Sequence, residues 1–283
     1  MPVSISLGQS QVVAGSNNSV FTYNFPNSAS FVQGDKIALQ NLALYYSWTN
    51  ISSTYGNNTF SYIWTGSSTT TTAVVIPNGF YSIAQLNSYL QSRFFANGQY
   101  LIDASGNYVY YLEIVANSSL NSFQINSYPV PQTLPTGFTQ PANWAGYSAS
   151  ASNSPQLIIP ATNIQTLLGF ATGTYPPAAQ NTAYSATSTT TPQISPVTSV
   201  YMFCSLVRNN LSRPNLILYN FSPNVGYGSQ IQITPPYLVY IPIQAGNYPS
   251  ITVSFYDQNF NSLVVGDPNM TILLAIKLAS EEI

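Results

Sequence analysis

Short runs of β-branched and aromatic residues, each closed by Gly, Pro or Asn, recur along most of the chain. The run Val20–Phe25, for example, alternates in polarity and stops at Pro26-Asn27. Runs of this length, separated by turn residues, are typical of β-sandwiches and barrels. We therefore predict an all-β chain built on two packed sheets. The predicted strands are 20–25, 36–48, 60–64, 73–76, 108–115, 123–128, 200–207, 216–221, 230–234, 237–243, 251–256 and 270–278.

One segment after the early strands predicts a short helix instead. Ser82-Ile-Ala-Gln85 is a capping box, in which the Ser hydroxyl and the Gln side chain satisfy backbone amides at a helix start. The apolar residues that follow recur at spacings of three and four and form one stripe: Ile83, Leu86, Leu90 and Phe94. Asn97-Gly98 supplies a stop signal. We expect a helix from 83 to about 95.

A second capping box, Thr162-Asn-Ile-Gln165, predicts a shorter connector helix. It opens a single turn through Leu167 and Leu168, and Gly169 closes that turn.

The middle of the chain has a different composition. Residues 129–155 are rich in Pro, Gly, Ser and Ala, and residues 171–199 carry no charge. We expect long irregular loops, or an insertion, over 129–199 within one domain spanning 1–283. Unpartnered surface loops are one alternative; we favour contact with other chains, because large aromatic side chains are costly to leave in water. The expected subunit-interface residues are Trp144, Tyr147, Tyr175 and Tyr184.

Charge is almost absent from this sequence. Only 4% of the 283 residues are charged, with five basic and seven acidic side chains, where a soluble domain has roughly 25%. Five basic residues argue against direct nucleic-acid binding, which needs clustered Lys and Arg. A surface of Asn, Ser, Thr, Gln and Tyr instead suits burial against neighbouring subunits.

The sequence predicts no enzyme, no cofactor and no metal site. It has no His, the most frequent general base and metal ligand. Cys204 lies in the apolar run 200–207 and is expected to be a buried thiol. Turn-capping roles are expected for four carboxylates, and pairing or exposure for Glu113. The four are Asp35, Asp103, Asp257 and Asp267.

Three alternatives remain open at this point. A carboxylate-based glycosidase would need two acids facing one cleft. Calcium could bind at Asp257-Gln-Asn259 or at Asp267-Pro-Asn269. A carbohydrate-binding sandwich or adhesin would need an exposed aromatic platform, although strand aromatics more often fill a core or a subunit contact. The aromatics considered are Tyr45, Tyr46, Trp48, Tyr62, Trp64, Tyr110, Tyr111, Tyr237, Tyr240 and Tyr256.

No targeting or membrane segment is expected. The first eight residues lack a basic region and a long apolar stretch, so they do not predict a signal peptide. No apolar stretch reaches the roughly 20 residues that span a bilayer. We expect synthesis in a cytoplasm.

A series of short motifs runs along the chain in a characteristic order. The first half of the series is Phe21-Thr-Tyr-Asn-Phe25, Asp35-Lys-Ile-Ala-Leu39, Tyr45-Tyr-Ser-Trp48 and Ile76-Pro-Asn-Gly-Phe-Tyr81. The second half is Leu167-Leu-Gly-Phe170, Thr191-Pro-Gln-Ile-Ser-Pro196, Cys204-Ser-Leu-Val207, Leu218-Tyr-Asn-Phe221, Tyr240-Ile-Pro-Ile243, Phe255-Tyr-Asp-Gln258 and Asp267-Pro-Asn-Met270. The order of these motifs resembles a known capsid family, the penton and minor capsid proteins of large and polinton-like double-stranded DNA viruses and virophages. The resemblance covers nearly the whole chain.

This resemblance implies a single jelly roll with two antiparallel sheets. It also implies a homopentamer at the fivefold vertices of an icosahedral shell, assembled in the host cytoplasm. The implied partners are a double jelly-roll major capsid protein and other minor capsid proteins. The penton is our first expectation, and an interstitial minor capsid protein is the alternative within the family.

Overall fold

The computed structural model describes residues 3–281 and shows two compact units. The terminal unit combines the chain up to Trp48 with the chain from Val197 onward, and the inserted unit is Thr49–Pro196. We expected one domain over 1–283 with a special segment at 129–199. The inserted unit ends at Pro196, close to the expected 199, but begins at Thr49, because apolar residues of 129–199 share one core with residues that follow Thr49.

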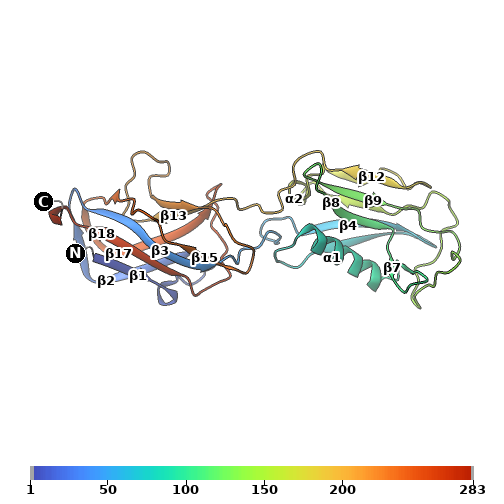
Figure 1. Ribbon diagram of the computed structural model, residues 1–283, viewed down its shortest axis with the longest axis horizontal. Coiled ribbons are helices and arrows are strands. Elements are labelled where there is room, and N and C mark those ends of the chain that lie inside the picture. Colours follow the sequence, from blue (N-terminus) through green and yellow to red (C-terminus); the bar gives the residue numbers. More distant parts are fainter. Residues whose placement is uncertain (1–2, 282–283) are drawn as a thin grey trace. The chain divides into compact units, whose positions relative to one another are not determined.

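The terminal unit is a sandwich of two antiparallel sheets (Figure 1). The first sheet has the order β1 (Val3–Leu7), β18 (Thr271–Lys277), β3 (Lys36–Tyr45) and β15 (Gln230–Ile233), with β16 (Ile241–Pro242) also paired to β3. The second has the order β14 (Ile217–Phe221), β13 (Val200–Cys204), β17 (Gly246–Asp257) and β2 (Val20–Phe31).

Strand pairing identifies this sandwich as a jelly roll. Apart from the two-residue β16, the first strand of the unit pairs with the last (β1 with β18) and the second with the second last (β2 with β17). The next two nested pairs are β3 with β15 and β13 with β14. This nesting is what a long hairpin gives when it rolls into two sheets, so the predicted all-β jelly roll is confirmed. The inserted unit leaves after β3 and returns before β13.

The predicted strand 20–25 is too short, because β2 runs through Pro26 to Phe31. Proline removes a ladder donor, so it is tolerated on edge strands and at bulges. Both conditions hold here: β2 lies at the edge of its sheet, and its register with β17 shifts between Tyr248 and Ser250.

The inserted unit has two further antiparallel sheets and a helix. One sheet has the order β11 (Gly173–Tyr175), β10 (Gln156–Ile159), β4 (Thr59–Thr65) and β5 (Thr69–Val75). The other has the order β12 (Tyr184–Thr187), β9 (Ser122–Ser127) and β8 (Leu112–Asn117). A small pair joins β6 (Leu101–Ile102) to β7 (Tyr108–Val109), so the predicted strand 108–115 is broken in two.

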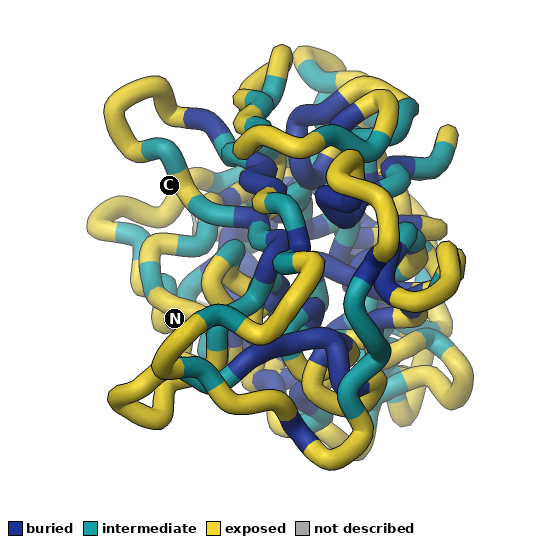
Figure 2. The backbone as a smooth tube through the Cα atoms, turned by 90° about the vertical axis from the view of Figure 1, so that its right-hand side faces the viewer, coloured by how far each residue is buried: buried dark blue, intermediate teal, exposed yellow. Residues whose placement is uncertain are grey.

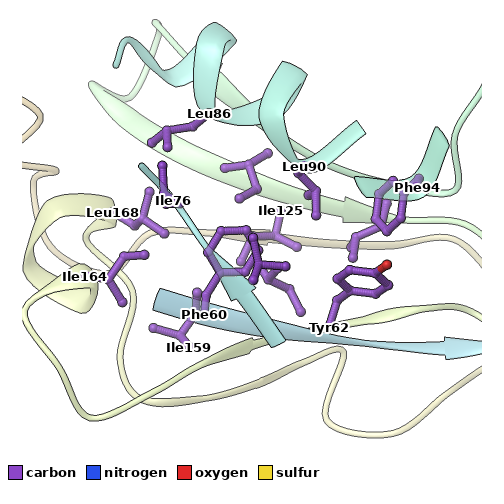
Figure 3. Packing of buried hydrophobic residues seen from close by; sticks show 14 of the residues in the cluster. Phe60, Tyr62, Ile76, Leu86, Leu90, Phe94, Ile125, Ile159, Ile164 and Leu168 are labelled. Atoms are coloured by element: carbon purple, nitrogen blue, oxygen red, sulfur yellow. The ribbon is translucent and has the colours of Figure 1, made fainter. Parts of the chain in front are cut away.

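Helix α1 (Ile83–Ala96) confirms the predicted helix and its capping box. The Ser82 side chain accepts from the Gln85 amide, and the Gln85 side chain accepts from the Ser82 amide. Leu86, Leu90 and Phe94 point from α1 toward Ile125 and the strand residues Phe60 and Tyr62 (Figure 3). The stripe read from the sequence therefore becomes one side of the inserted unit's core.

Helix α2 (Ile164–Leu168) confirms the short connector but not its predicted cap. The N-cap is Asn163 without a side-chain cap hydrogen bond, and the buried Thr162 hydroxyl has no hydrogen-bond partner among the described atoms. Gly169 closes the helix at φ +76°, a left-handed conformation that glycine adopts without strain. Short 3₁₀ turns cover Gln9–Gln11 and Ala279–Glu281. Within residues 3–281, each helix is too short or too polar to cross a membrane.

The middle segment contains more order than the sequence indicated. Residues 129–155 lie outside the regular elements, as expected, but 156–187 contribute β10, α2, β11 and β12. Its buried residues Val130, Leu157, Ile159 and Phe170 belong to the core cluster. The segment therefore contributes to the core of the inserted unit. Figure 2 shows exposed loops of the backbone around buried segments.

Candidate assembly interface

Two aspartates hold turns by the same local pattern. One carboxylate oxygen of Asp257 accepts from the backbone amides two and four residues further on, at 2.8 and 2.9 Å. Asp103 does the same, at 2.8 and 2.8 Å. Hydrogen bonds from the backbone and side chain of Asn107 lower the pKa of Asp103. Both predicted turn-capping roles are confirmed.

The other two aspartates each join segments that are distant in sequence. Asp35 is buried and accepts from the amides of Val32 and Ala279, both at 2.8 Å. Asp267 accepts from the amide of Tyr45 at 3.1 Å, besides capping its own turn. These carboxylates are therefore structural acceptors in the terminal unit.

Glu113 on β8 is also engaged, as predicted. It accepts from the Asn126 side chain at 2.9 Å on the neighbouring strand β9. The hydroxyl of Tyr128 lies 3.5 Å away, and burial together with this carboxylate raises the pKa of Tyr128. In the part of the chain that the structure describes, no group of three or more acidic or Cys side chains is placed to hold a metal ion.

Cys204 is a buried thiol on β13. Its side chain is fully covered, and burial raises its pKa to about 12. A thiol with this pKa stays protonated near neutral pH, so it is not a nucleophile there.

The structure brings two of the predicted interface residues together. The rings of Trp144 and Tyr147 are 5.1 Å apart, and Trp144 also meets the buried Trp64 edge to face at 6.2 Å. Tyr147 donates to the side chain of Gln140 at 2.8 Å. Both rings are half-buried within the inserted unit, so part of their apolar surface is covered without another chain.

The other two predicted residues, Tyr175 and Tyr184, lie on β11 and β12 and are also half-buried. The Tyr175 ring packs on Phe170 at 5.3 Å, and its hydroxyl donates to the carbonyl of Ala171. Burial raises the pKa of Tyr184, with a smaller contribution from the Tyr175 hydroxyl nearby. A contact of these four residues with another chain stays a prediction.

The terminal unit carries an aromatic patch of which the sequence analysis considered only Tyr256. We define it as Tyr201, Phe203, Tyr256 and Phe260. Tyr201 and Tyr256 are direct partners across β13 and β17, and the ring of Phe203 lies 4.6 Å from that of Tyr256. Strand side chains alternate between faces, and the residues between them, such as Met202, are fully buried in the sandwich. The patch therefore lies on the outer face of this sheet.

Phe260 completes the patch in a strained conformation. It has φ +61°, and its ring lies 5.4 Å from Tyr201 and 5.9 Å from Phe203. Such a backbone is rare for a bulky side chain and costs about 1–3 kcal/mol. The Asp257 turn holds it there, because the Phe260 amide donates to the Asp257 carbonyl at 3.0 Å. Strain of this kind is concentrated at functional sites.

A second apolar surface lies on the connection between β15 and β16. We call residues 235–239, Pro-Pro-Tyr-Leu-Val, the apolar loop. Tyr237 is 84% exposed and Val239 62% exposed. The predicted strand 237–243 is wrong over these residues, because only Ile241–Pro242 pair with β3. A run of large side chains this exposed marks a surface used for contact.

The patch and the apolar loop suit protein contact better than chemistry. Neither contains a charged or nucleophilic side chain, and aromatic residues are enriched in the buried centres of protein interfaces. The alternation Val200-Tyr-Met-Phe-Cys204 was the available signal for two patch residues. The position of Phe260 depends on a turn geometry that the sequence does not reveal.

Comparison with protein-family models and with curated proteins finds no match. Among solved structures, the chain is similar to the mavirus penton protein, with 10% identity, a TM-score of 0.45 and 98% of each chain covered. It is also similar to a chain of the Sputnik virophage, with 11% identity, a TM-score of 0.40, and coverage of 100% of this chain and 99% of that one. The fold assignment itself rests on the strand pairing described above.

Proposed function

We propose that this chain is a structural protein of an icosahedral virus shell, a penton that forms rings of five at the fivefold vertices. The observation that carries the proposal is a jelly roll with two uncharged apolar surfaces, the aromatic patch and the apolar loop. The jelly roll is a common capsid fold, but it also occurs in lectins and cupins, so the surfaces decide between these functions.

A ring of five needs two different surfaces on each copy. In a closed ring, one surface of a subunit meets another surface of the next, and no surface meets itself. The patch lies on the sheet containing β13 and β17, and the apolar loop lies on the edge of the sheet containing β3. We infer that the apolar loop of one copy covers the aromatic patch of its neighbour. Trp144, Tyr147, Tyr175 and Tyr184 are proposed as additional contacts, made by the inserted unit.

In this proposal the chain works without catalysis. The carboxylates described above accept hydrogen bonds from the chain's own amides, and the Cys204 thiol is covered. The proposed partners are further copies, a major capsid protein of the double jelly-roll type and other minor capsid proteins. The proposed location is the vertex of the virion after assembly in the host cytoplasm.

Class averages of the purified protein in electron micrographs test the ring. We expect fivefold symmetry for the unmodified protein. We expect the ring of five to be lost in Tyr237→Ser, because this substitution removes the most exposed side chain of the apolar loop. Leu120→Ser is the control, because Leu120 is 65% exposed on the connection between β8 and β9 and plays no part in the proposed contact. Single copies or twofold particles under all conditions would overturn the penton proposal.

Two other outcomes distinguish the alternatives. An interstitial minor capsid protein would give no closed ring alone but would bind a major capsid protein. A carbohydrate-binding sandwich would stay monomeric, and glycans would perturb patch resonances such as those of Tyr201 and Tyr256.

A further inference from the structure

The outer edge of β5 in the inserted unit is an unprotected sheet edge. The strand reads Thr69-Thr-Thr-Thr-Ala-Val-Val75, and all its backbone ladder partners lie on β4. It has no charged residue, no proline and no register shift. Exposed edges that are long, regular and uncharged bind further strands, so proteins usually block them.

The other edge strands in residues 3–281 show such protection. β8 packs against α1, whose Asn87 side chain accepts from the Ile114 amide at 2.9 Å. β2 contains Pro26 and an irregular register, and β11 has three residues and is followed by Pro176. The remaining edge strands are short: β1, β12, β14 and β15 have four or five residues each, and β6, β7 and β16 have two each.

The pairing with β4 shows which groups of β5 point outward. The Ile76 amide donates to the carbonyl of Asn58 at 2.8 Å, so these two residues form a hydrogen-bonded pair. Along an antiparallel ladder every second residue forms such a pair, so from Ile76 onward every second residue of β5 directs its backbone groups toward β4. Val74, Thr72 and Thr70 face β4. Thr69, Thr71, Ala73 and Val75 direct their N–H and C=O groups away from it. The Tyr89 hydroxyl donates to the outward carbonyl of Val75. The backbone N–H and C=O groups of Thr69, Thr71 and Ala73 therefore remain available to a further strand.

We propose that β5 pairs antiparallel with β5 of a second copy about a twofold axis at Thr71. In this register Thr71 faces Thr71 of the second copy, and Thr69 faces its Ala73 on each side. The three open residues of each copy then exchange about six hydrogen bonds, two for each facing pair. The two sheets become one continuous sheet across the axis.

Two observations favour a second copy as the occupant. Among the edge strands just described, only another β5 offers seven regular residues to match these seven. Where an antiparallel strand pairs with the same strand of a second copy, a residue near the twofold axis lies opposite the equivalent residue of that copy. A charged side chain there would be repelled by its equivalent. β5 has none, and its residues 69–71 and 73 are exposed. The contact is twofold, so it is independent of a ring of five, and in a penton it joins copies from different rings.

Native mass of charge variants tests this contact. Thr71→Lys and Thr71→Glu each place like charges opposite each other, and we expect either variant alone to have half the mass of the unmodified protein. Mixed in equal amounts at low salt, the two variants should regain the full mass. This twofold ratio holds for a single chain, and for a ring whose five β5 edges all meet one second ring, so it is separate from the test of the proposed function. Thr59→Lys, on an exposed position of the inner strand β4, is the control and should leave the mass unchanged.

Amide hydrogen exchange gives a second readout that does not depend on a substitution. Exchange at Thr69, Thr71 and Ala73 should slow at least tenfold as the concentration rises, whereas Thr70 and Thr72, already paired with β4, should not change. Equal mass for Thr71→Lys and the unmodified protein, or concentration-independent exchange at Thr71, overturns the proposal.

Discussion

Replacing Phe260 tests the strained turn that completes the aromatic patch. Its ring is 42% exposed, so a little over half of the roughly 200 Å² of a Phe side chain is covered. At ~25 cal/mol per Å² this burial stabilises the fold by about 3 kcal/mol, or about 2 kcal/mol when compact unfolded chains are considered. Phe260→Ala loses this contribution but keeps the left-handed backbone, so we expect a cost of about 2 kcal/mol.

Phe260→Gly loses the same ring but relieves the backbone. Glycine adopts positive φ freely, whereas an L side chain there costs about 1–2 kcal/mol. We therefore expect Phe260→Gly to be more stable than Phe260→Ala by about 1 kcal/mol. At an ordinary exposed position the order is the reverse, because glycine makes the unfolded chain more flexible.

Amide exchange of β13 and β17 as a function of urea measures this difference in the terminal unit alone. With a slope of about 1–3 kcal/mol per M, the midpoints of the two variants should differ by about 0.3–1 M. An alanine variant equal to or more stable than the glycine variant would refute the strained conformation. Both variants should also weaken assembly of the ring of five, because each removes the exposed phenyl group of the aromatic patch.

Three further predictions concern the core and the titrating groups. Leu90→Ala should destabilise the inserted unit by about 2–5 kcal/mol, because Leu90 is fully buried. Ser82→Ala should destabilise it by about 0.5–2 kcal/mol, because the helix loses its cap. Thermal unfolding checks both, and an unchanged midpoint for Leu90→Ala contradicts the packing. Burial raises the pKa of Cys204 from 9.0 to about 12, so the thiol of the unfolded chain loses its proton at a lower pH than the thiol of the folded chain. The free energy of unfolding should therefore fall as the pH rises between those values, and it should fall less in Cys204→Ala. Urea titrations at pH 8 and pH 11 measure this, and an equal fall in both proteins contradicts it. Since the chain has no His, assembly should be nearly constant from about pH 5 to 8, and a sharp step near pH 6 in light scattering would contradict that expectation.

Sequence reasoning succeeded where a local pattern determines local structure. The capping box at Ser82 and the stripe through Leu90 define α1 without knowledge of what covers it. The alternation in 251–256 predicts a strand because one face of β17 is buried and the other is not. Asp257 and Asp103 were assigned to turns for a similarly local reason: their carboxylates bond to amides two and four residues on.

The missed features depend on contacts between distant residues. The loop-rich composition of 129–199 ends near Val197, but no change in composition marks Trp48, so the start of the inserted unit is set by which core each segment joins. β10 and β11 are short and lie in a segment rich in loop residues, and they form strands because β4 pairs with β10 and β10 in turn pairs with β11. Trp144 and Tyr147 were expected to need another chain, but Trp64 covers part of that surface.

The native mass of the purified protein tests the proposed ring of five. We expect a species of five chains of 30.7 kDa, or of ten where β5 joins two rings, with little change between about 0.05 and 0.5 M salt because the proposed contacts carry no charge. A single chain or a dimer at all concentrations, or a ring that dissociates as salt rises, would contradict it.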